Sequence, residues 1–142
     1  INFRIYWDGN LEDEILDSIG STPSAMKIDS WVDGRLVSTD DRWGQFTGLT
    51  NNGTKANPVL VADILGDWRE ELILRQNTDD ALILYTTTTE TGHRLYTLMH
   101  DPVYRIAISW QNTAYNQPPH PGFYPGNGVA SAPTPDVHLI RP

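Results

Sequence analysis

The sequence predicts an all-β fold, and three observations lead to this prediction. Short runs of β-branched and aromatic residues recur along the 142 residues, separated by Gly, Asn, Asp and Pro. No long amphipathic helix is visible. One unit of strand, acidic loop and strand occurs twice, at residues 5–18 and 62–75. A sheet unit that repeats in this way is typical of a β-propeller blade, which buries both faces only when neighbouring blades stack on it.

The expected strands follow one another along the chain, each bounded by turn-forming residues. The first run, NFRIYW, starts in the alternation typical of a strand, and the runs VLVA and LILR are apolar enough to be buried. The tail after residue 112 is rich in Pro and Gly, with one more strand expected near 136–140. We predict strands at 2–7, 14–18, 26–31, 35–39, 59–63, 71–76, 81–88, 94–99 and 104–111.

The internal repeat sets the expected domain organisation. Its offset is 57 residues, and the matched pairs are Gly9 with Gly66, Asn10 with Asp67, Glu14 with Glu71, and Ile15 with Leu72. A weaker echo occupies 99–109. We expect one blade at about 1–50, a second at 51–101 and a partial closing blade at 102–142. Because a propeller needs about four blades or more, we predict a segment of a longer propeller, or a homo-oligomer if the chain stands alone.

Composition excludes several kinds of partner. The formal net charge is -8 and the sequence pI is about 4.7, which argues against nucleic acid and anionic membrane surfaces. Without cysteine, neither a disulfide nor a Cys-ligated zinc can form. No apolar run is long enough to span a membrane. We interpret the N-terminus, which lacks an initiator Met, as a processed or truncated edge. An acidic substrate would require local positive charge from Lys, Arg or a metal.

The two acidic loops are predicted to bind calcium. Asp63, Asp67 and Glu71 are spaced four residues apart, and on a helix they would share one face and repel one another. In a tight loop between strands, the same spacing gathers carboxylates around a point, and calcium takes six to eight oxygen ligands. Leu65 would contribute its backbone carbonyl. The first unit repeats the layout with Asp8, Asn10 and Glu14.

A solvated acidic turn, with Trp68 packed beneath the second loop, is the simpler interpretation and stays open. The spacing departs from the common calcium-loop pattern, since Leu65 stands where an inner carboxylate is expected. Repetition at matched positions strengthens the calcium interpretation in both loops, so that it is favoured at 63–71 and equal to the solvated turn at 8–14.

Two irregular loops contain the residues predicted to touch a substrate. Lys55, one of only two lysines, lies in the loop 51–58 immediately before a strand. Loops on a rigid scaffold are where binding and catalytic residues concentrate. The second loop is Pro-rich, and its candidates are Tyr115, His120, Asn112 and Asn116. An exposed charge at Lys55, a packed ring at Tyr115 and a His120 without a role remain the alternatives.

Several stretches resemble the rhamnogalacturonan endolyases of polysaccharide lyase family 11. They are ADILGDWREELI, YTTT, RLYTLMHDPVYRIAISWQN, YNQPPHPGFY, NNGTKANP and IYWDGNLEDEILD, of which LMHDPVYR and YNQPPH are the most specific. The resemblance extends over nearly the whole chain. It implies an eight-bladed propeller with structural calcium ions, of which this chain forms the last two to three blades. It also implies a secreted, extracellular enzyme that degrades pectin.

The resemblance implies β-elimination in the rhamnogalacturonan I backbone at galacturonate C4, leaving an unsaturated uronate end. The reaction removes the C5 proton, neutralises the developing enolate and protonates the leaving oxygen. We predict Lys55 as base or carboxylate clamp, and Tyr115 as substrate contact or proton donor. His120, Asn112 and Asn116 are predicted substrate contacts.

A binding role is the alternative to catalysis. A non-catalytic propeller fragment would hold calcium and carbohydrate without turning a substrate over, with the remainder of the propeller as its partner. An integrin-like repeat that binds proteins is disfavoured by the irregular acidic loops and by the YNQPPH run.

Overall fold

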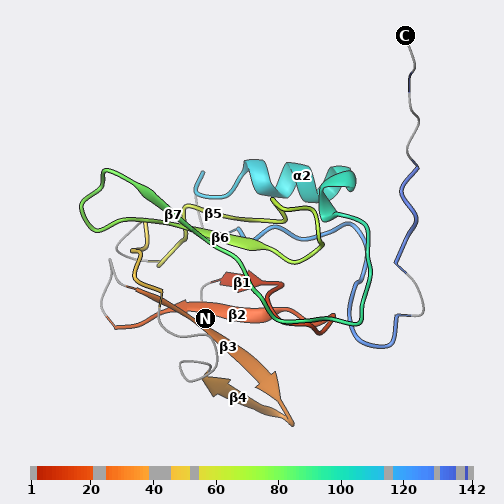
Figure 1. The fold of residues 1–142 in the computed structure, drawn as a ribbon, viewed down its shortest axis with the longest axis horizontal. Helices are drawn as coiled ribbons and strands as arrows, with labels where there is room; N and C mark the ends of the chain where they lie inside the picture. Colours follow the sequence, from red (N-terminus) through yellow and green to blue (C-terminus); the bar gives the residue numbers. More distant parts are fainter. Residues whose placement is uncertain are drawn as a thin grey trace.

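The chain forms two antiparallel sheets, followed by two short helices (Figure 1). The computed structural model describes residues 3–20, 25–38, 46–51, 55–113, 117–129, 132–136 and 140. The first sheet contains, in spatial order, β1 (Phe3–Ile5), β2 (Glu14–Ser18), β3 (Met26–Val32) and β4 (Arg35–Ser38). The second contains β5 (Leu60–Ala62), β6 (Glu71–Arg75) and β7 (Leu82–Tyr85). The helices are the 3-10 helix η1 (Leu98–His100) and the α-helix α2 (Pro102–Ser109).

The structure confirms the internal repeat. β1 pairs Phe3 with Leu16 of β2, and β5 pairs Leu60 with Ile73 of β6, each residue 57 positions further along the chain. The next strand of the second sheet is shifted by one residue, since Ile15 pairs with Asp29 but Leu72 pairs with Tyr85. Because the first two strands of each sheet pair in the same register, the acidic loop that joins them has the same place in both sheets.

Apolar side chains from both sheets meet in one core. Phe3 and Ile5 of β1 pack there with Leu72 and Leu74 of β6. Tyr6, immediately after β1, belongs instead to a second core with Tyr104 of helix α2. Figure 1 shows the same layering, with α2 on one side of β5–β7 and the first sheet on the other. Alternate residues at β1 thus serve two cores, which fixes the segment on both faces.

The first seven predicted strands are present, and 14–18 has the predicted bounds. The predicted strand 81–88 is shortened to Leu82–Tyr85. Residues 94–99 are not a strand, because Thr97 caps η1 and the carboxylate of Asp63 accepts hydrogen bonds from Thr97 Oγ1 and Leu98 N, both 2.7 Å away. The expected strand near 136–140 lies largely outside the described residues.

The predicted strand at 104–111 is wrong, because this segment forms helix α2. The side chain of Asp101 accepts a hydrogen bond from Val103 N at 3.0 Å and caps the helix, and Pro102 occupies its first turn. Tyr104 and Ala107 are buried three residues apart on one helix face. The β-branched residues of this segment suggested a strand. The Asp-Pro pair at its start and the burial of two residues spaced three apart instead favour a helix.

The free edge of β5 is covered by a side chain. Gln111, two residues after α2, donates from Nε2 to the carbonyl of Val61 at 2.7 Å and accepts from Val61 N at 2.9 Å. Its amide therefore makes the pair of hydrogen bonds that a neighbouring strand would make. Neither helix in the described part of the chain has the length and apolar character that crossing a membrane requires.

Candidate functional site

The first acidic corner, residues 6–14, is closed by Glu14. Its Oε2 atom accepts hydrogen bonds from Trp7 N at 2.8 Å and Asp8 N at 3.2 Å. Asp8 in turn accepts from the backbone N of Asn10 at 2.6 Å and from its Nδ2 at 3.1 Å. Glu14 and Asp8 are both buried, and burial, followed by the charge of Asp8, raises the pKa of Glu14 to about 8.

The second acidic corner, residues 63–71, is closed in the same way. Glu71 Oε2 accepts from Ile64 N at 2.8 Å and Leu65 N at 2.9 Å, and its Oε1 accepts from Thr86 Oγ1 at 3.1 Å. Glu71 and the two donors to its Oε2 atom each follow their counterparts in the first corner by 57 residues. The repeated glutamate thus satisfies backbone N–H groups that the turn leaves without partners.

The other predicted ligands of the second corner also bond to protein groups. Asp67 pairs with Arg69, with 2.5 Å between its Oδ2 and Arg69 Nη2. Asp63 uses its Oδ2 on the η1 segment, while its buried Oδ1 has no partner among the described residues. Leu65 points its side chain to solvent. Within the described parts of the chain, no group of three or more His, Asp or Glu side chains is arranged to hold a metal.

Replacing Glu14 with glutamine is expected to flatten the pH dependence of stability. The pKa of a free glutamate is near 4.5, and that of folded Glu14 is about 8. Between these values the unfolded chain has released a proton that the folded chain keeps, so the free energy of unfolding of the wild type falls as pH rises. Glutamine does not titrate, yet its oxygen still accepts from Trp7 and Asp8.

Denaturant titrations from about pH 5 to pH 8 measure this slope. The matched control is Glu12→Gln, which removes the same charge from an exposed neighbour. If Glu14→Gln and Glu12→Gln show the same pH dependence, the raised pKa of Glu14 is refuted.

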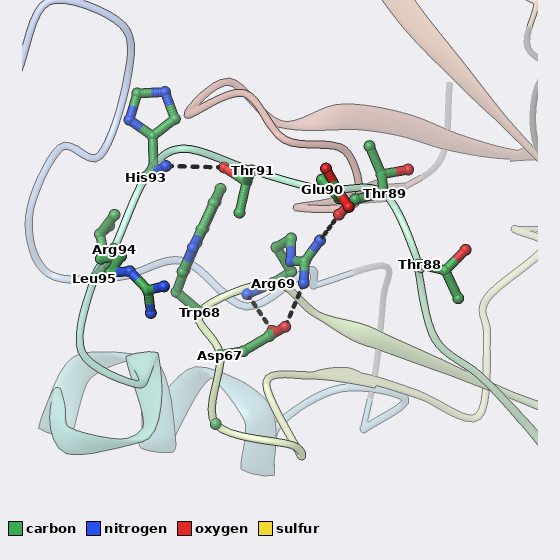
Figure 2. Close-up of a pocket in the computed structure, with 11 residues that line it drawn as sticks. Asp67, Trp68, Arg69, Thr88, Thr89, Glu90, Thr91, His93, Arg94 and Leu95 are labelled. Carbon is green, nitrogen blue, oxygen red and sulfur yellow. Dashed lines mark hydrogen bonds and ion pairs between the residues drawn. The ribbon is translucent and has the colours of Figure 1, made fainter.

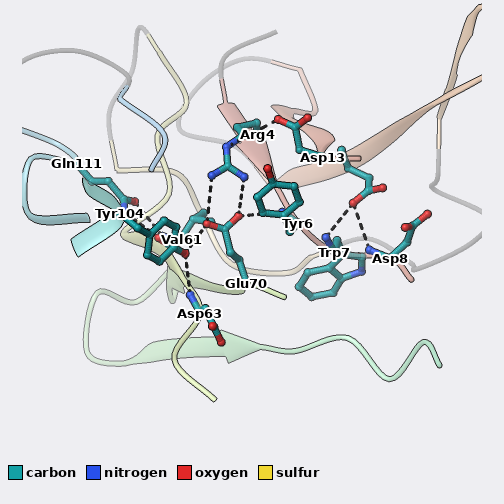
Figure 3. A network of polar contacts seen from close by, with 11 residues as sticks. Arg4, Tyr6, Trp7, Asp8, Asp13, Val61, Asp63, Glu70, Tyr104 and Gln111 are labelled. Carbon is teal, nitrogen blue, oxygen red and sulfur yellow. Dashed lines mark hydrogen bonds and ion pairs between the residues drawn. The ribbon is translucent and has the colours of Figure 1, made fainter. Parts of the chain in front are cut away.

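Glu70 lies at the centre of a polar network that joins both sheets to helix α2 (Figure 3). Its carboxylate accepts from Arg4 Nη1 at 3.1 Å, Tyr6 N at 2.8 Å and the Tyr104 hydroxyl at 2.6 Å. The Tyr104 hydroxyl also accepts from Asp63 N at 2.9 Å. The Glu70 side chain is completely buried, and burial raises its pKa while Arg4 opposes the shift. The calcium spacing passes over Glu70, so the sequence analysis missed it.

The predicted catalytic loop is braced by hydrogen bonds. Lys55 is half-buried in a turn that Asn51 closes. Asn51 donates from its backbone N to the Asn57 carbonyl at 2.8 Å and from its Nδ2 to the Pro58 carbonyl at 3.2 Å. Asn112 donates from Nδ2 to the same Pro58 carbonyl at 3.1 Å. The loop of Lys55 and the turn that contains Asn112 therefore meet at one carbonyl group.

Three other predicted substrate residues follow Asn112 in the chain. Tyr115 and Asn116 lie outside the described residues. His120 is exposed over part of its surface. Burial of the remainder, followed by the charge of Arg4, lowers the pKa of its imidazole. The structure thus brings together the Lys55 and Asn112 loops, and it places His120 within the electrostatic reach of Arg4.

A polar groove of about 630 Å³ lies at the other end of β5 from Lys55 (Figure 2). Its walls are the second acidic corner and the segment 88–95. Arg69 and Arg94 line it, together with His93, and the sequence analysis singled out none of these three. The chain has eight arginines, so composition gives no signal that would have distinguished these residues.

Two antiparallel sheets, whose first strand pairs share one register and are joined by the same acid-closed corner, define this chain as an all-β repeat domain. Residues 1–135 match the family model described as rhamnogalacturonan lyase family 11, C-terminal domain, and the chain belongs to this family.

Its relatives are much longer proteins. The chain is 52% identical over 137 residues to rhamnogalacturonan endolyase YesW of Bacillus subtilis (strain 168), covering 96% of the chain and 21% of YesW. The crystal structure of exotype rhamnogalacturonan lyase YesX superposes with a TM-score of 0.86 at 51% identity, over 96% of this chain and 23% of that one. Bacillus licheniformis rhamnogalacturonan lyase PL11 gives 0.82 at 48% identity, over 97% and 22%. The chain spans about a fifth of the length of these relatives.

Proposed function

We propose that this chain is the C-terminal part of a rhamnogalacturonan lyase, which cleaves the rhamnogalacturonan I backbone by β-elimination at galacturonate C4. The family match over residues 1–135 is the observation that carries this proposal. The identity of about half to both an endolyase and an exolyase supports the bond and the chemistry that these two names share. A secreted, extracellular enzyme fits a polymeric substrate of this size.

The proposed mechanism assigns roles to the two braced loops. Lys55 removes the C5 proton or clamps the galacturonate carboxylate, whose negative charge grows as the enolate develops. Tyr115 contacts the sugar or protonates the leaving oxygen. Asn112 is a proposed substrate contact, and its hydrogen bond to the Pro58 carbonyl beside the Lys55 turn supports this role. His120 and Asn116 are the remaining proposed substrate contacts.

The experiment is to incubate the intact protein with rhamnogalacturonan I and record the ultraviolet absorbance of the unsaturated uronate. Absorbance should rise with chain cleavage. A polymer whose carboxylates have been reduced to alcohols is the control, because it lacks the group that acidifies the C5 proton. New reducing ends without absorbance would mean hydrolysis and would overturn the proposal.

We propose that the two sheets are successive blades among the last two to three of an eight-bladed propeller. The support is the exposed apolar surface of the outer strands. Trp31 and Leu36, paired across β3 and β4, are 62% and 44% exposed, and Leu82 of β7 is 64% exposed. Apolar side chains in such positions favour contact with neighbouring blades, so the remainder of the propeller is the proposed partner.

We propose that calcium binds the first acidic corner rather than the second. A cavity of about 40 Å³ is lined there by acidic side chains and by Ser30, whose buried Oγ has no partner among the described residues. Burial disfavours the ionised form of Glu14 in this corner most strongly, and repulsion by the charge of Asp8 adds to this effect. A bound cation would supply the positive charge that offsets this repulsion. In the second corner, Arg69 already supplies a positive charge to Asp67.

Adding calcium is expected to raise the melting temperature of the protein, and a chelator should reverse the rise. At a calcium concentration of about one hundred times Kd, binding adds about 2.7 kcal/mol to the free energy of unfolding. Asp8→Asn should abolish the effect. Asp67→Asn, the matched change in the second corner, should preserve it. Equal calcium shifts in Asp8→Asn and the wild type would remove the assignment.

A further inference from the structure

We propose that the groove between the second acidic corner and the segment 88–95 binds a uronate residue of an acidic polysaccharide, with Arg94 holding its carboxylate. The groove lies beyond the C-terminal end of β5, whereas Lys55 precedes the strand. It is therefore a second carbohydrate site, separate from the proposed catalytic loops. The choice of galacturonate as the uronate rests on the proposed function.

The first wall of the groove is rigid. Arg69 joins this wall to the opposite one, because its guanidinium pairs with Asp67 and its Nη1 donates a hydrogen bond to the carbonyl of Thr89 in the segment 88–95. Gly66 and Trp68 both have left-handed backbone angles, with φ of 79° and 73°. For tryptophan this conformation is unfavourable, and it persists because Trp68 is buried against Tyr6, with 6.3 Å between ring centroids. Strain of this kind is concentrated at binding sites.

The second wall is fixed to the first acidic corner. Thr91 donates from Oγ1 to the carbonyl of Gly9 at 2.7 Å. A side chain at Gly9 would place its Cβ 2.7 Å from the carbonyl oxygen of Glu90, so only glycine allows this approach. With both walls held by long-range contacts, a ligand would meet a preformed groove and order little on binding.

Arg94 supplies the positive charge that a carboxylate needs. It is exposed, and within the described residues it has no ion-pair partner. Figure 2 shows its guanidinium extending into the groove. Guanidinium and carboxylate can form two parallel hydrogen bonds, which makes arginine well suited to this recognition.

The remaining groups select a sugar acid rather than a phosphate. The carboxylate of Asp67, 47% exposed, and that of the exposed Glu90 both line the groove, and carboxylates act as hydrogen-bond acceptors. Sugar hydroxyls donate to such groups, whereas a doubly charged phosphate would be repelled by them. Thr88 adds a hydroxyl to the lining. A uronate has one carboxylate and several hydroxyl groups. The groove offers Arg94 to bind the carboxylate, and the side chains of Asp67 and Glu90 to accept hydrogen bonds from the hydroxyl groups.

The test is a titration of the isotope-labelled intact protein with a rhamnogalacturonan I oligosaccharide, followed by nuclear magnetic resonance. Backbone amide signals of Arg94 and Thr91 report on the groove, and that of Lys55 reports on the other end of β5. Arg94→Gln is expected to weaken binding at the groove roughly tenfold or more, the loss of a charged hydrogen-bonding pair. Arg35→Gln, which removes the same charge from β4, should bind as the wild type does.

The oligosaccharide with its carboxylates reduced provides the second arm. It should bind the wild type as weakly as Arg94→Gln binds the acidic form, and Arg94→Gln should weaken it no further. Equal binding of the acidic oligosaccharide by wild type and Arg94→Gln overturns the proposal, as do shifts confined to the Lys55 end. Lyase activity is read separately. Groove binding without an unsaturated product would refute the proposed function alone, and product formation with an Arg94-independent groove would refute this inference alone.

Discussion

Replacing Glu70 with alanine is expected to lower the free energy of unfolding by about 3–5 kcal/mol, because it leaves the charge of Arg4 buried without its main partner. Arg4 is 7% exposed and Glu70 is completely buried. The substitution also removes the acceptor for Tyr6 N and for the Tyr104 hydroxyl. A typical domain is stable by only about 5–15 kcal/mol, so this single change could leave the chain largely unfolded. Urea denaturation measures the loss.

The control for Glu70 is the other carboxylate that faces Arg4. Asp13 lies 3.8 Å from Arg4 Nε and its side chain is 47% exposed, so Asp13→Ala should change stability by less than about 1 kcal/mol. Adding Arg4→Met to Glu70→Ala should recover part of the loss, since no charge then remains buried. If Glu70→Ala destabilises no more than Asp13→Ala, the network is not a main source of stability.

Lys55→Ala in the intact protein is expected to reduce kcat/KM for rhamnogalacturonan I by roughly 10²–10⁴-fold, the contribution typical of a general base. The fold should be unaffected, because Asn51 closes the Lys55 turn with hydrogen bonds to the carbonyls of Asn57 and Pro58, and these bonds remain in the variant. Initial rates of absorbance increase give the loss, and an unchanged melting temperature shows that folding is intact.

The only other lysine in the sequence provides a matched control. Lys27 pairs with Asp29 at 2.8 Å within the first sheet, so Lys27→Ala should keep the lyase activity. Lys55→Arg separates the two roles of Lys55. Arginine keeps the positive charge but is too basic to accept the C5 proton at neutral pH, so a clamp would survive the change and a base would not. Full activity in Lys55→Ala would exclude both roles.

The sequence predicted the repeated sheets well because their signal is local. β2 and β6 are short apolar runs that begin with the matched glutamates Glu14 and Glu71, and both strands were found at the expected offset. The use of those glutamates was not predictable from spacing. A glutamate that binds a cation and one that accepts hydrogen bonds from backbone N–H groups can occupy the same position in a sequence pattern, and only the geometry of the turn distinguishes them.

Long-range partners explain the other differences. The residues 104–109 are β-branched enough for a strand, yet the buried hydroxyl of Tyr104 reaches Glu70 only from a helix that Asp101 caps. Arg69 and Arg94 are 25 residues apart in the sequence and line one groove only because the segment 88–95 after β7 lies against the second corner. Neither contact has a sequence pattern of its own, so neither could be anticipated from composition or periodicity.

The order in which the sheets close has a consequence for synthesis. The outer edge of the β1 segment is covered at Tyr6 by Glu70, which follows it by 64 residues, and the edge of β5 is covered at Val61 by Gln111, which follows it by 50. Each sheet therefore keeps an open, pairing-competent edge until a later part of the chain has left the ribosome. During that interval, the nascent chain is most exposed to wrong pairing with a second copy, and the interval ends for β5 only when Gln111 has emerged.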